Sequence, residues 1–257
     1  MSAQAFEFDG PHGYRLAGRL ELPDGQSRGW AILAHCFTCG KDSLAASRVA
    51  RALAAHGIGV LRFDFAGLGN SGGNFADTTF AADVDDLIAA GNAMTRDGKP
   101  PSILVGHSLG GAAVLMAAGQ MSGIRAVVTL AAPFDTGHVL HQFAPQSRET
   151  IETHGEAEVL LAGRPFVVRK SFVDDLACHN LESRIAGLRI PLLVLHSPLD
   201  STVGIKNAAR ILAAAKHPKS FISLDDADHL LTRRADADYA AAMISTWASR
   251  YLISQFE

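Results

Sequence analysis

The chain has 257 residues, a formal net charge of −3, and 48% hydrophobic and 19% charged residues. This composition is ordinary for one globular α/β domain with a large core, and the small negative charge gives no reason to expect binding to nucleic acid or to an anionic membrane. Apolar runs stay shorter than the roughly 18 residues that a membrane-spanning helix needs, and the first residues lack the pattern of a signal peptide, so we expect a cytoplasmic protein.

The hydrophobic pattern predicts strands and helices in alternation after an opening hairpin. Strands are predicted at residues 6–8, 15–22, 30–34, 58–63, 102–105, 125–131, 190–196 and 220–224. Helices are predicted at residues 42–56, 80–94, 110–118, 203–215 and 235–253. This order predicts an α/β protein with a mostly parallel eight-stranded sheet and helices on both faces, in a single domain over residues 1–257.

The segment from about residue 133 to residue 188 does not fit this alternation. It follows the sixth predicted strand, and Gly163-Arg164 between two apolar runs predicts a hairpin turn. Long insertions in compact domains usually form lids or binding loops, so we predict a lid or cap, with a decorative surface insertion as the alternative. His138 and His141 have a spacing that suits one helix face, but no third ligand stands convincingly near them, so no metal is expected.

Residues 106–110 read Gly-His-Ser-Leu-Gly and follow an apolar run that is typical of a strand. A strand that turns abruptly into a helix holds the central residue in a strained, exposed conformation and needs glycine on either side of it. Ser108 would then present its hydroxyl above the sheet, with the N-terminus of a helix behind it. The pattern predicts a nucleophilic serine, and the alternative is a Gly/Ser turn between two core elements.

A nucleophilic serine needs an imidazole that accepts its proton and a carboxylate that holds the imidazole. Asp200 follows the predicted strand at residues 190–196, and His229 follows the predicted strand at residues 220–224. Both therefore belong to loops at the carboxyl edge of the sheet, where such sites gather. The chain order Ser, Asp, His also fits this kind of nucleophile turn. We predict Ser108, Asp200 and His229 as the catalytic residues.

Both partners of the serine have alternatives. Asp200 is also suited to capping the helix that follows it, and His229 has the alternative of an ordinary surface histidine. Three rival acids crowd the predicted base in sequence without ending a strand: Asp225, Asp226 and Asp228. Among the other histidines, His196 is the second choice for the active site, and the side chain of His107 is expected to point away from the base.

These motifs resemble those of the α/β-hydrolase family of serine esterases, lipases and related enzymes, over nearly the whole chain. Residues 33–38 occupy the place of the family's His-Gly-x loop, and residues 62–71 look like its Asp-x-x-Gly-x-Gly-x-Ser loop. The resemblance implies an oxyanion hole made by the backbone N–H groups of Phe37 and Leu109. Such preorganised donors contribute about 3 to 4 kcal/mol each to catalysis.

The resemblance implies a serine hydrolase without a cofactor that cleaves carboxylic esters of small or medium acyl groups through an acyl-enzyme. A thioesterase, amidase, acyltransferase or perhydrolase would use the same residues, because the fold and the triad do not fix the acyl acceptor. A binding or scaffold module that keeps the pocket without turnover is the alternative of another class. The expected partner is a small-molecule ester.

At a finer level, residues 35–42, 63–71 and 217–220 are similar to a bacterial subgroup in which an α/β-hydrolase domain precedes an OsmC-type, peroxide-reducing domain. This chain ends at Glu257, after the last predicted helix. We therefore do not expect thiol peroxidase chemistry, and we expect either a stand-alone relative or a part separated from an OsmC-type domain.

Cys36 stands where the resembled family usually has glycine, and with Cys39 it makes a Cys-x-x-Cys spacing. That spacing is typical of a thioredoxin-like redox pair or of half a zinc site. A zinc site needs four ligands, and Cys178, the only other cysteine, is far along the chain. Three cysteines, an odd number, argue against a disulfide framework. Because Phe37 inside the motif already belongs to the implied oxyanion loop, we expect two small buried thiols, with a redox pair as the alternative.

Residues 67–72 also satisfy Gly-x-Gly-x-x-Gly, the pattern of a dinucleotide site. That site requires a helix directly after the glycines, whereas residues 73–77 continue as a loop. We therefore expect no nicotinamide cofactor and interpret the loop as part of the rim near the serine.

Overall fold

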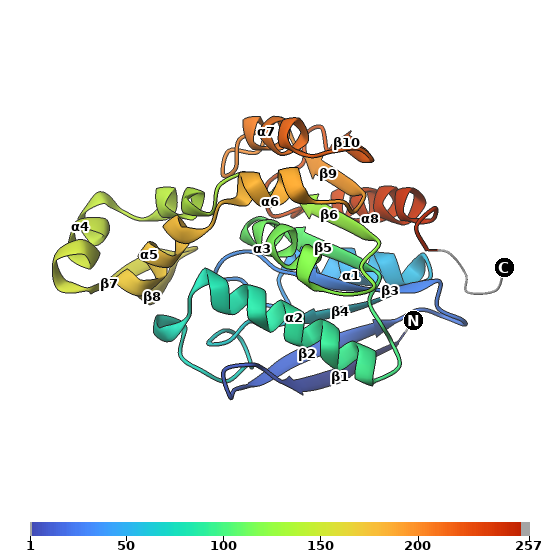
Figure 1. The fold of residues 1–257 in the computed structure, drawn as a ribbon, viewed down its shortest axis with the longest axis horizontal. Coiled ribbons are helices and arrows are strands. Elements are labelled where there is room, and N and C mark those ends of the chain that lie inside the picture. The colour runs from blue at the N-terminus through green and yellow to red at the C-terminus, as the bar shows by residue number, and fades with distance from the viewer. Residues whose placement is uncertain (1, 253–257) are drawn as a thin grey trace.

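The computed structural model describes residues 2–252, and an eight-stranded sheet forms its centre (Figure 1). The strand order is β1-β2-β4-β3-β5-β6-β9-β10, in which β1–β2 and β2–β4 are antiparallel and the other pairs are parallel. The strands are β1 (Ser2–Asp9), β2 (Arg15–Leu22), β3 (Gly29–Ala34), β4 (Ile58–Phe63), β5 (Ile103–His107), β6 (Ala126–Leu130), β9 (Leu192–His196) and β10 (Lys219–Ser223). The predicted fold class is therefore confirmed.

Helices cover both faces of this sheet (Figure 1). They are α1 (Leu44–Ala55), α2 (Phe80–Arg96), α3 (Leu109–Ala117), α6 (Leu181–Gly187), α7 (Lys206–Ala214) and α8 (Arg234–Ala248). The helices α1 and α8 pack on one face, and α2, α3, α6 and α7 pack on the other. Within residues 2–252, none of the helices is long and apolar enough to cross a bilayer.

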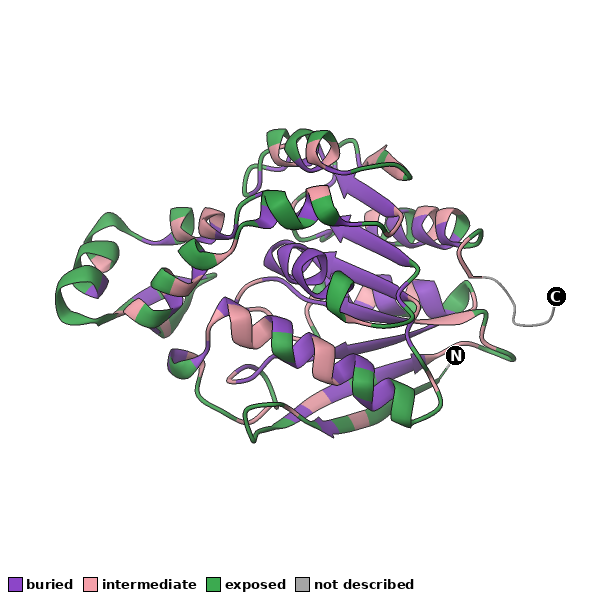
Figure 2. Ribbon diagram, viewed as in Figure 1, coloured by how far each residue is buried: buried purple, intermediate pink, exposed green. Residues whose placement is uncertain are grey.

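Alternate side chains of the central strands enter two separate cores. In β3, Ala31 and Leu33 join the core with α1 and α8, whereas Ile32 and Ala34 join the core with α2 and α3. The central strands are therefore buried on both faces (Figure 2). Parallel strands that helices cover on both sides read as continuous apolar runs, which is why they were recognisable in the sequence.

A few element ends differ from their predicted positions. The strand β1 begins at Ser2 because its whole length pairs with β2, although its first residues are exposed and carry no apolar signal. The helix α7 begins at Lys206, after a turn that the Asp200 side chain binds. The last helix ends at Ala248, and the final residue of the predicted range 235–253 lies outside the described residues.

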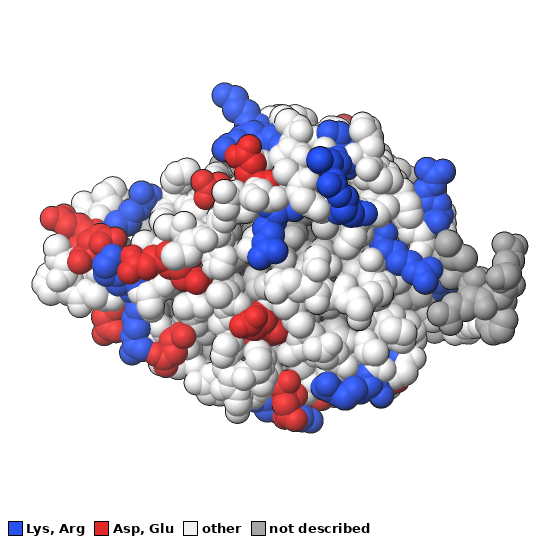
Figure 3. Space-filling view, viewed as in Figure 1, with Lys and Arg blue, Asp and Glu red and all other residues white. Residues whose placement is uncertain are grey.

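The segment between β6 and β9 contains further elements. They are a 3-10 helix (Thr136–Gln142), α4 (Pro145–His154), β7 (Glu156–Leu161), β8 (Arg164–Arg169), α5 (Lys170–Cys178) and the helix α6. The helix α6 packs against α3 and α7, whereas α4 and the β7–β8 hairpin extend away from the sheet (Figure 1). The hairpin turns at Ala162 and Gly163, both with positive φ, slightly before the predicted turn. Charged side chains of both signs gather at this end (Figure 3), where Lys170 pairs with Glu152.

A buried ion network ties the loop after β3 to two neighbouring strands. Arg62 of β4 is fully buried and donates to the carboxylate of Glu21 on β2 at 2.7 Å. It also donates to the backbone carbonyl of Lys41 and to the carboxylate of Asp42, each at 2.5 Å. The ammonium of Lys41 in turn lies 2.6 Å from a carboxylate oxygen of Asp64. Every buried charge named here thus has an opposite charge beside it, as burial requires.

Replacing Arg62 with alanine should destabilise the protein strongly, because buried Glu21 would lose its close partner and keep only the exposed guanidinium of Arg51 at 4.0 Å. We expect the free energy of unfolding to fall by about 3 to 5 kcal/mol, measured by urea unfolding followed by circular dichroism. The control is Arg19→Ala, at an exposed arginine of β2, which should change stability by less than about 0.5 kcal/mol. An Arg62→Ala variant as stable as this control would contradict the role of the network.

Candidate active site

Ser108 occupies the sharp turn between β5 and α3, with φ 55° and ψ −125°. A residue other than glycine rarely adopts positive φ, so the backbone is strained at this position. A Cβ on Gly106 would lie 2.2 Å from the carbonyl oxygen of Gly110, and a Cβ on Gly110 would lie 2.4 Å from that of His35. Both positions thus require glycine, and the second contact presses the start of α3 against the loop after β3.

Three side chains from different parts of the chain meet at the carboxyl edge of the sheet. The hydroxyl of Ser108 lies 3.0 Å from Nε2 of His229, and Nδ1 of His229 lies 2.7 Å from Oδ2 of Asp200. Asp200 follows β9 and His229 follows β10, while Ser108 follows β5, so the parallel strands bring the three together. In this arrangement the imidazole can accept the hydroxyl proton while the carboxylate stabilises the resulting cation.

The two oxygens of Asp200 have different partners. Oδ2 faces His229, whereas Oδ1 accepts hydrogen bonds from the backbone N–H groups of Thr202 and Val203 at 2.9 and 2.8 Å. The capping alternative is thus partly right, because the same carboxylate also holds the turn before α7. Burial acts to raise the pKa of Asp200, but the hydrogen bonds from His229, Val203 and Thr202 outweigh it and hold the pKa below its ordinary value. The carboxyl is therefore ionised beside the imidazole.

Two further histidines lie beside this group. The expectation that His107 points away was wrong: its ring lies 5.1 Å from the ring of His229, and its Nε2 donates to the carbonyl of His229 at 2.7 Å. Burial lowers the pKa of His107 to about 3, so this ring is neutral. His196, the second choice, is also buried and donates to the carbonyl of Val203 at 2.6 Å, with Asp200 at 3.6 Å. These rings support the loops that carry the acid and the base.

The three rival acids have other surroundings. Asp226 pairs with Arg233 at 2.7 Å, and Asp228 accepts a hydrogen bond from the backbone N–H of Thr232 at 2.9 Å. Asp225 is exposed to solvent. The imidazole of His229 is thus bound by Asp200, the acid predicted from its place after a strand, and not by any of the three rivals.

The loop after β3 differs from the sequence expectation in its chemistry. Cys36 and Cys39 form a disulfide rather than two thiols. The backbone N–H of Cys39 also donates to the carbonyl of Cys36 at 3.1 Å, and Thr38 between them has φ 55°. Four consecutive residues are therefore closed into a tight ring that contains Phe37. The spacing of the cysteines was visible in the sequence, but their pairing depends on this turn.

A pocket with aromatic walls opens beside the serine turn. The space inside it that a water molecule could occupy is about 10 Å³, so its walls lie close together. Residues that line it include Phe37, Phe65, Phe75, Leu109, Phe172 and Asp83. Phe37 stacks on Phe172 of α5, with ring centroids 5.3 Å apart. The sequence predicted Phe37 and Leu109 in this region, but no pattern in it indicated the residues that α2 and α5 contribute, such as Asp83 and Phe172.

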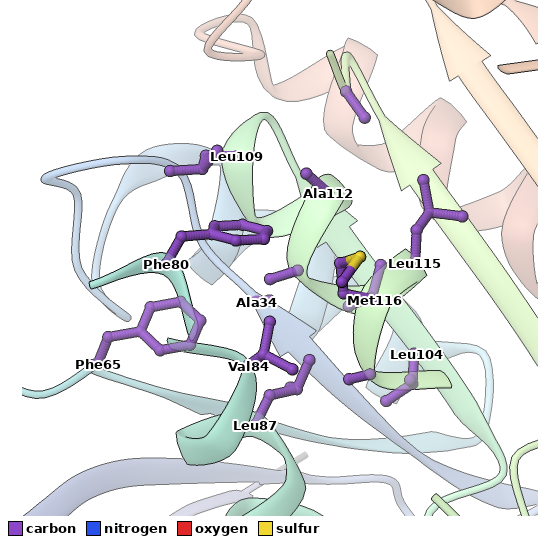
Figure 4. Close-up of a cluster of buried hydrophobic side chains, with 14 of the residues drawn as sticks. Ala34, Phe65, Phe80, Val84, Leu87, Leu104, Leu109, Ala112, Leu115 and Met116 are labelled. Atoms are coloured by element: carbon purple, nitrogen blue, oxygen red, sulfur yellow. The ribbon is translucent and has the colours of Figure 1, made fainter. Parts of the chain in front are cut away.

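Asp83 is the charged residue of this lining, on the first turn of α2. Burial and the nearby carboxylates of Asp86 and Asp175 raise the pKa of Asp83 well above its ordinary value. Figure 4 shows the apolar packing of the same helix, with Phe80 of α2 pointing toward α3 and Val84 beside Ala34 of β3. The acid therefore belongs to a mostly apolar wall, whose other polar side chains are His35, Thr38 and Thr78.

The glycine-rich loop 67–72 folds back on itself. The backbone N–H of Gly67 donates to the carbonyl of Gly72 at 2.8 Å, and that of Asn70 donates to the carboxylate of Asp64 at 2.9 Å. Leu68 lines the pocket, so the loop lies at the rim near the serine, as the sequence predicted. Across residues 2–252, no cluster of three or more histidine, cysteine or acidic side chains could hold a metal ion.

Known proteins resemble this chain in both sequence and structure. A crystal structure of the esterase domain of a Rhodothermus marinus protein is 45% identical, with a TM-score of 0.81 over 98% of this chain and 100% of that one. Mouse mitochondrial palmitoyl-protein thioesterase ABHD10 is 27% identical over 187 residues, which are 70% of this chain and 62% of that protein. The monoacylglycerol lipase of Mycolicibacterium smegmatis is 26% identical over 226 residues, 77% of this chain and 79% of that protein.

A family model also matches most of the chain. The model of the alpha/beta hydrolase family covers residues 31–242, which include the serine turn and both loops that carry the acid and the base. Its fold, with the mostly parallel sheet and helices on both faces, is the one described above. The chain therefore belongs to the alpha/beta hydrolase family.

Proposed function

We propose that this protein is a serine hydrolase that cleaves carboxylic esters with small or medium acyl groups. The observation that carries the proposal is the continuous hydrogen-bonded series from the hydroxyl of Ser108 through His229 to Asp200, beside an aromatic pocket. The relative with 45% identity is named an esterase domain, which favours an oxygen ester over a thioester. The similarity to the subgroup with an OsmC-type domain stays a prediction.

In the first half of the reaction, Ser108 attacks the ester carbonyl while His229 takes its proton. Asp200 stabilises the imidazolium and keeps Nε2 directed at the hydroxyl. When the tetrahedral intermediate collapses, His229 gives the proton to the leaving alcohol, and the acyl group stays on Ser108. In the second half, His229 deprotonates a water molecule, which attacks the acyl-enzyme. The second intermediate then collapses, the acid leaves, and His229 returns the proton to the oxygen of Ser108.

The oxygen of the intermediate would be bound by the backbone N–H groups of Phe37 and Leu109. Leu109 is the first residue of α3, where N–H groups have no partner within the helix. Within residues 2–252, the N–H of Phe37 makes no hydrogen bond to the protein. Both residues line the same pocket, and the close contact between Gly110 and the carbonyl of His35 brings their backbones together. Donors held in this way bind the developing negative charge without having to reorganise.

Replacing Ser108 with alanine should abolish ester hydrolysis and leave the fold intact. We expect a fall of about 10⁶-fold in kcat with p-nitrophenyl acetate. A fluorophosphonate probe should add to Ser108 of the wild type, as peptide mass spectrometry can verify, and should not modify the variant. If the wild type neither turns over an ester panel nor reacts with the probe, the protein is a binding module and the proposal is wrong.

Replacing Asp200 with asparagine should lower kcat by about 10⁴-fold, because the imidazole would lose the partner that fixes its tautomer. The matched control is Asp226→Asn, which alters an exposed acid paired with Arg233 and should keep nearly full activity. The two variants differ in one carboxyl each, so their kcat values compare the two candidate acids directly. Equal activity of both variants would contradict the assignment of Asp200.

Replacing Phe172 with alanine should widen the pocket and shift the preference toward longer acyl groups. A methylene group in an apolar pocket changes discrimination by about 10-fold or more, so the ratio of kcat/KM for p-nitrophenyl octanoate to that for the acetate should rise by about 10-fold. The control is Phe221→Ala, at an exposed phenylalanine of β10. An unchanged ratio in the Phe172 variant would show that the acyl group binds elsewhere.

A thioesterase is the second candidate, because a curated relative is a palmitoyl-protein thioesterase. Oxygen esters and thioesters of the same acyl chain separate the two activities, since the acyl pocket is then constant. We expect the higher kcat/KM with the oxygen ester, and with a short acyl chain rather than palmitate.

A further inference from the structure

We propose that the disulfide between Cys36 and Cys39 directs the N–H group of Phe37 toward the reacting oxygen, so that its reduction lowers kcat. This inference rests on the proposed function and adds a positioning role for two residues outside the triad. The disulfide joins residues whose Cα atoms are 5.3 Å apart and encloses Phe37 and Thr38 between them. Reduction would then act on the step in which negative charge develops.

The backbone of this ring is held in a conformation that it would not adopt freely. Thr38 has φ 55°, in the left-handed region that favours glycine, although it is a β-branched residue. The backbone hydrogen bond from Cys39 to Cys36 closes the same turn as the disulfide. When the covalent link is opened, hydrogen bonds alone maintain the strained turn: the one from Cys39 to Cys36 and one from the guanidinium of Arg164 to the carbonyl of Thr38. The backbone therefore gains freedom at Cys36 and Phe37.

Residues outside the ring bind its carbonyl oxygens at Cys36 and Thr38, but none of these contacts involves the N–H group of Phe37. On one side, buried His35 donates from Nδ1 to the carbonyl of Cys36 at 2.8 Å. On the other side, the backbone N–H of Lys41 donates to Asp64 at 2.7 Å.

The side chain of Phe37 packs among three other phenylalanine rings: Phe75, Phe143 and Phe172. These contacts hold the ring of Phe37 in the pocket wall, whereas the direction of its N–H depends on the backbone dihedrals between Cys36 and Phe37. The disulfide is the covalent restraint on those dihedrals.

The disulfide is open to attack from one side. Cys39 is partly exposed, whereas Cys36 is buried and lines the pocket. A thiolate of a dithiol attacks Sγ of Cys39, and the bond to Cys36 breaks with Cys36 leaving as a thiolate. The second thiol of the reagent then attacks the mixed disulfide and releases Cys39. Two electrons pass from the dithiol to the protein, which ends with two thiols, while the reagent ends as a cyclic disulfide.

The expected effect is on kcat rather than on KM. Loss of one oxyanion donor lowers kcat by about 10²- to 10³-fold, and a donor that is misdirected for part of the time should cause a smaller loss, of about 10- to 100-fold. The donor binds the oxygen more strongly in the transition state than in the ester, so KM should change little. A disulfide with a purely structural role would not produce this split while the protein stays folded.

The test compares kcat and KM of the oxidised protein, the protein reduced with dithiothreitol and desalted under argon, and the protein reoxidised afterwards. Alkylation and mass spectrometry establish the state of each cysteine, and near-ultraviolet circular dichroism monitors the fold. We expect kcat to fall by about 10- to 100-fold on reduction and to recover on reoxidation. The double variant Cys36→Ser/Cys39→Ser should have the low kcat in the presence or absence of dithiothreitol. Cys178→Ser, at the exposed free cysteine, should respond like the wild type.

Three results would overturn the inference. They are an unchanged kcat in the fully reduced protein, a double variant as active as the oxidised wild type, and a loss of kcat that accompanies unfolding, which would assign the disulfide to stability alone. The oxidised wild type tests the proposed function separately: without ester turnover there, that function is wrong and this inference is wrong with it.

Discussion

The closeness of two backbones at Gly110 is the constraint on which the candidate active site depends. No side chain fits between the start of α3 and the carbonyl oxygen of His35, so the serine turn and the loop after β3 are pressed together. This contact brings Leu109, just before Gly110, and Phe37, just after His35 and Cys36, to the same pocket. A hydrophobic core alone would not give such a fit, because apolar packing is not directional.

The same loop is also part of what stabilises the sheet. Arg62 is buried in β4 and donates to the backbone of Lys41, a few residues after the disulfide, while it pairs with Glu21 of β2. The loop therefore has a strand pair on one side and the start of α3 on the other. The loop after β3 looks like a surface connection in the sequence, but its backbone is held on both sides by these contacts.

Much of this arrangement could be predicted from the sequence, because each part of it follows a strand. Ser108, Asp200 and His229 come after apolar runs, and parallel strands bring their carboxyl ends to one edge. The start of β1 could not be predicted in this way, since its exposed residues are ordered by pairing with β2 and not by burial. The period of the apolar pattern indicates which residues are buried. It gives no signal where a strand is extended by backbone hydrogen bonds alone.

The pocket and the disulfide were less predictable for a different reason. The contact between Phe37 and Phe172 joins the loop after β3 to α5, across a segment whose pattern does not specify its packing on the sheet. Cys36 and Cys39 have a spacing that suits free thiols and a disulfide equally, and the turn at Thr38 decides between them. Both features depend on long-range contacts or on single backbone dihedrals, which a local sequence pattern does not encode.

The backbone dihedrals of Ser108 have a thermodynamic consequence for the molecule as a whole. A residue with a side chain in this region of φ and ψ costs on the order of 1 to 3 kcal/mol, so the folded state is less stable than the same fold with glycine at this position. Holding the hydroxyl at the edge of the sheet therefore lowers the free energy of unfolding. Burial of the surrounding sheet stabilises the domain enough to offset this loss.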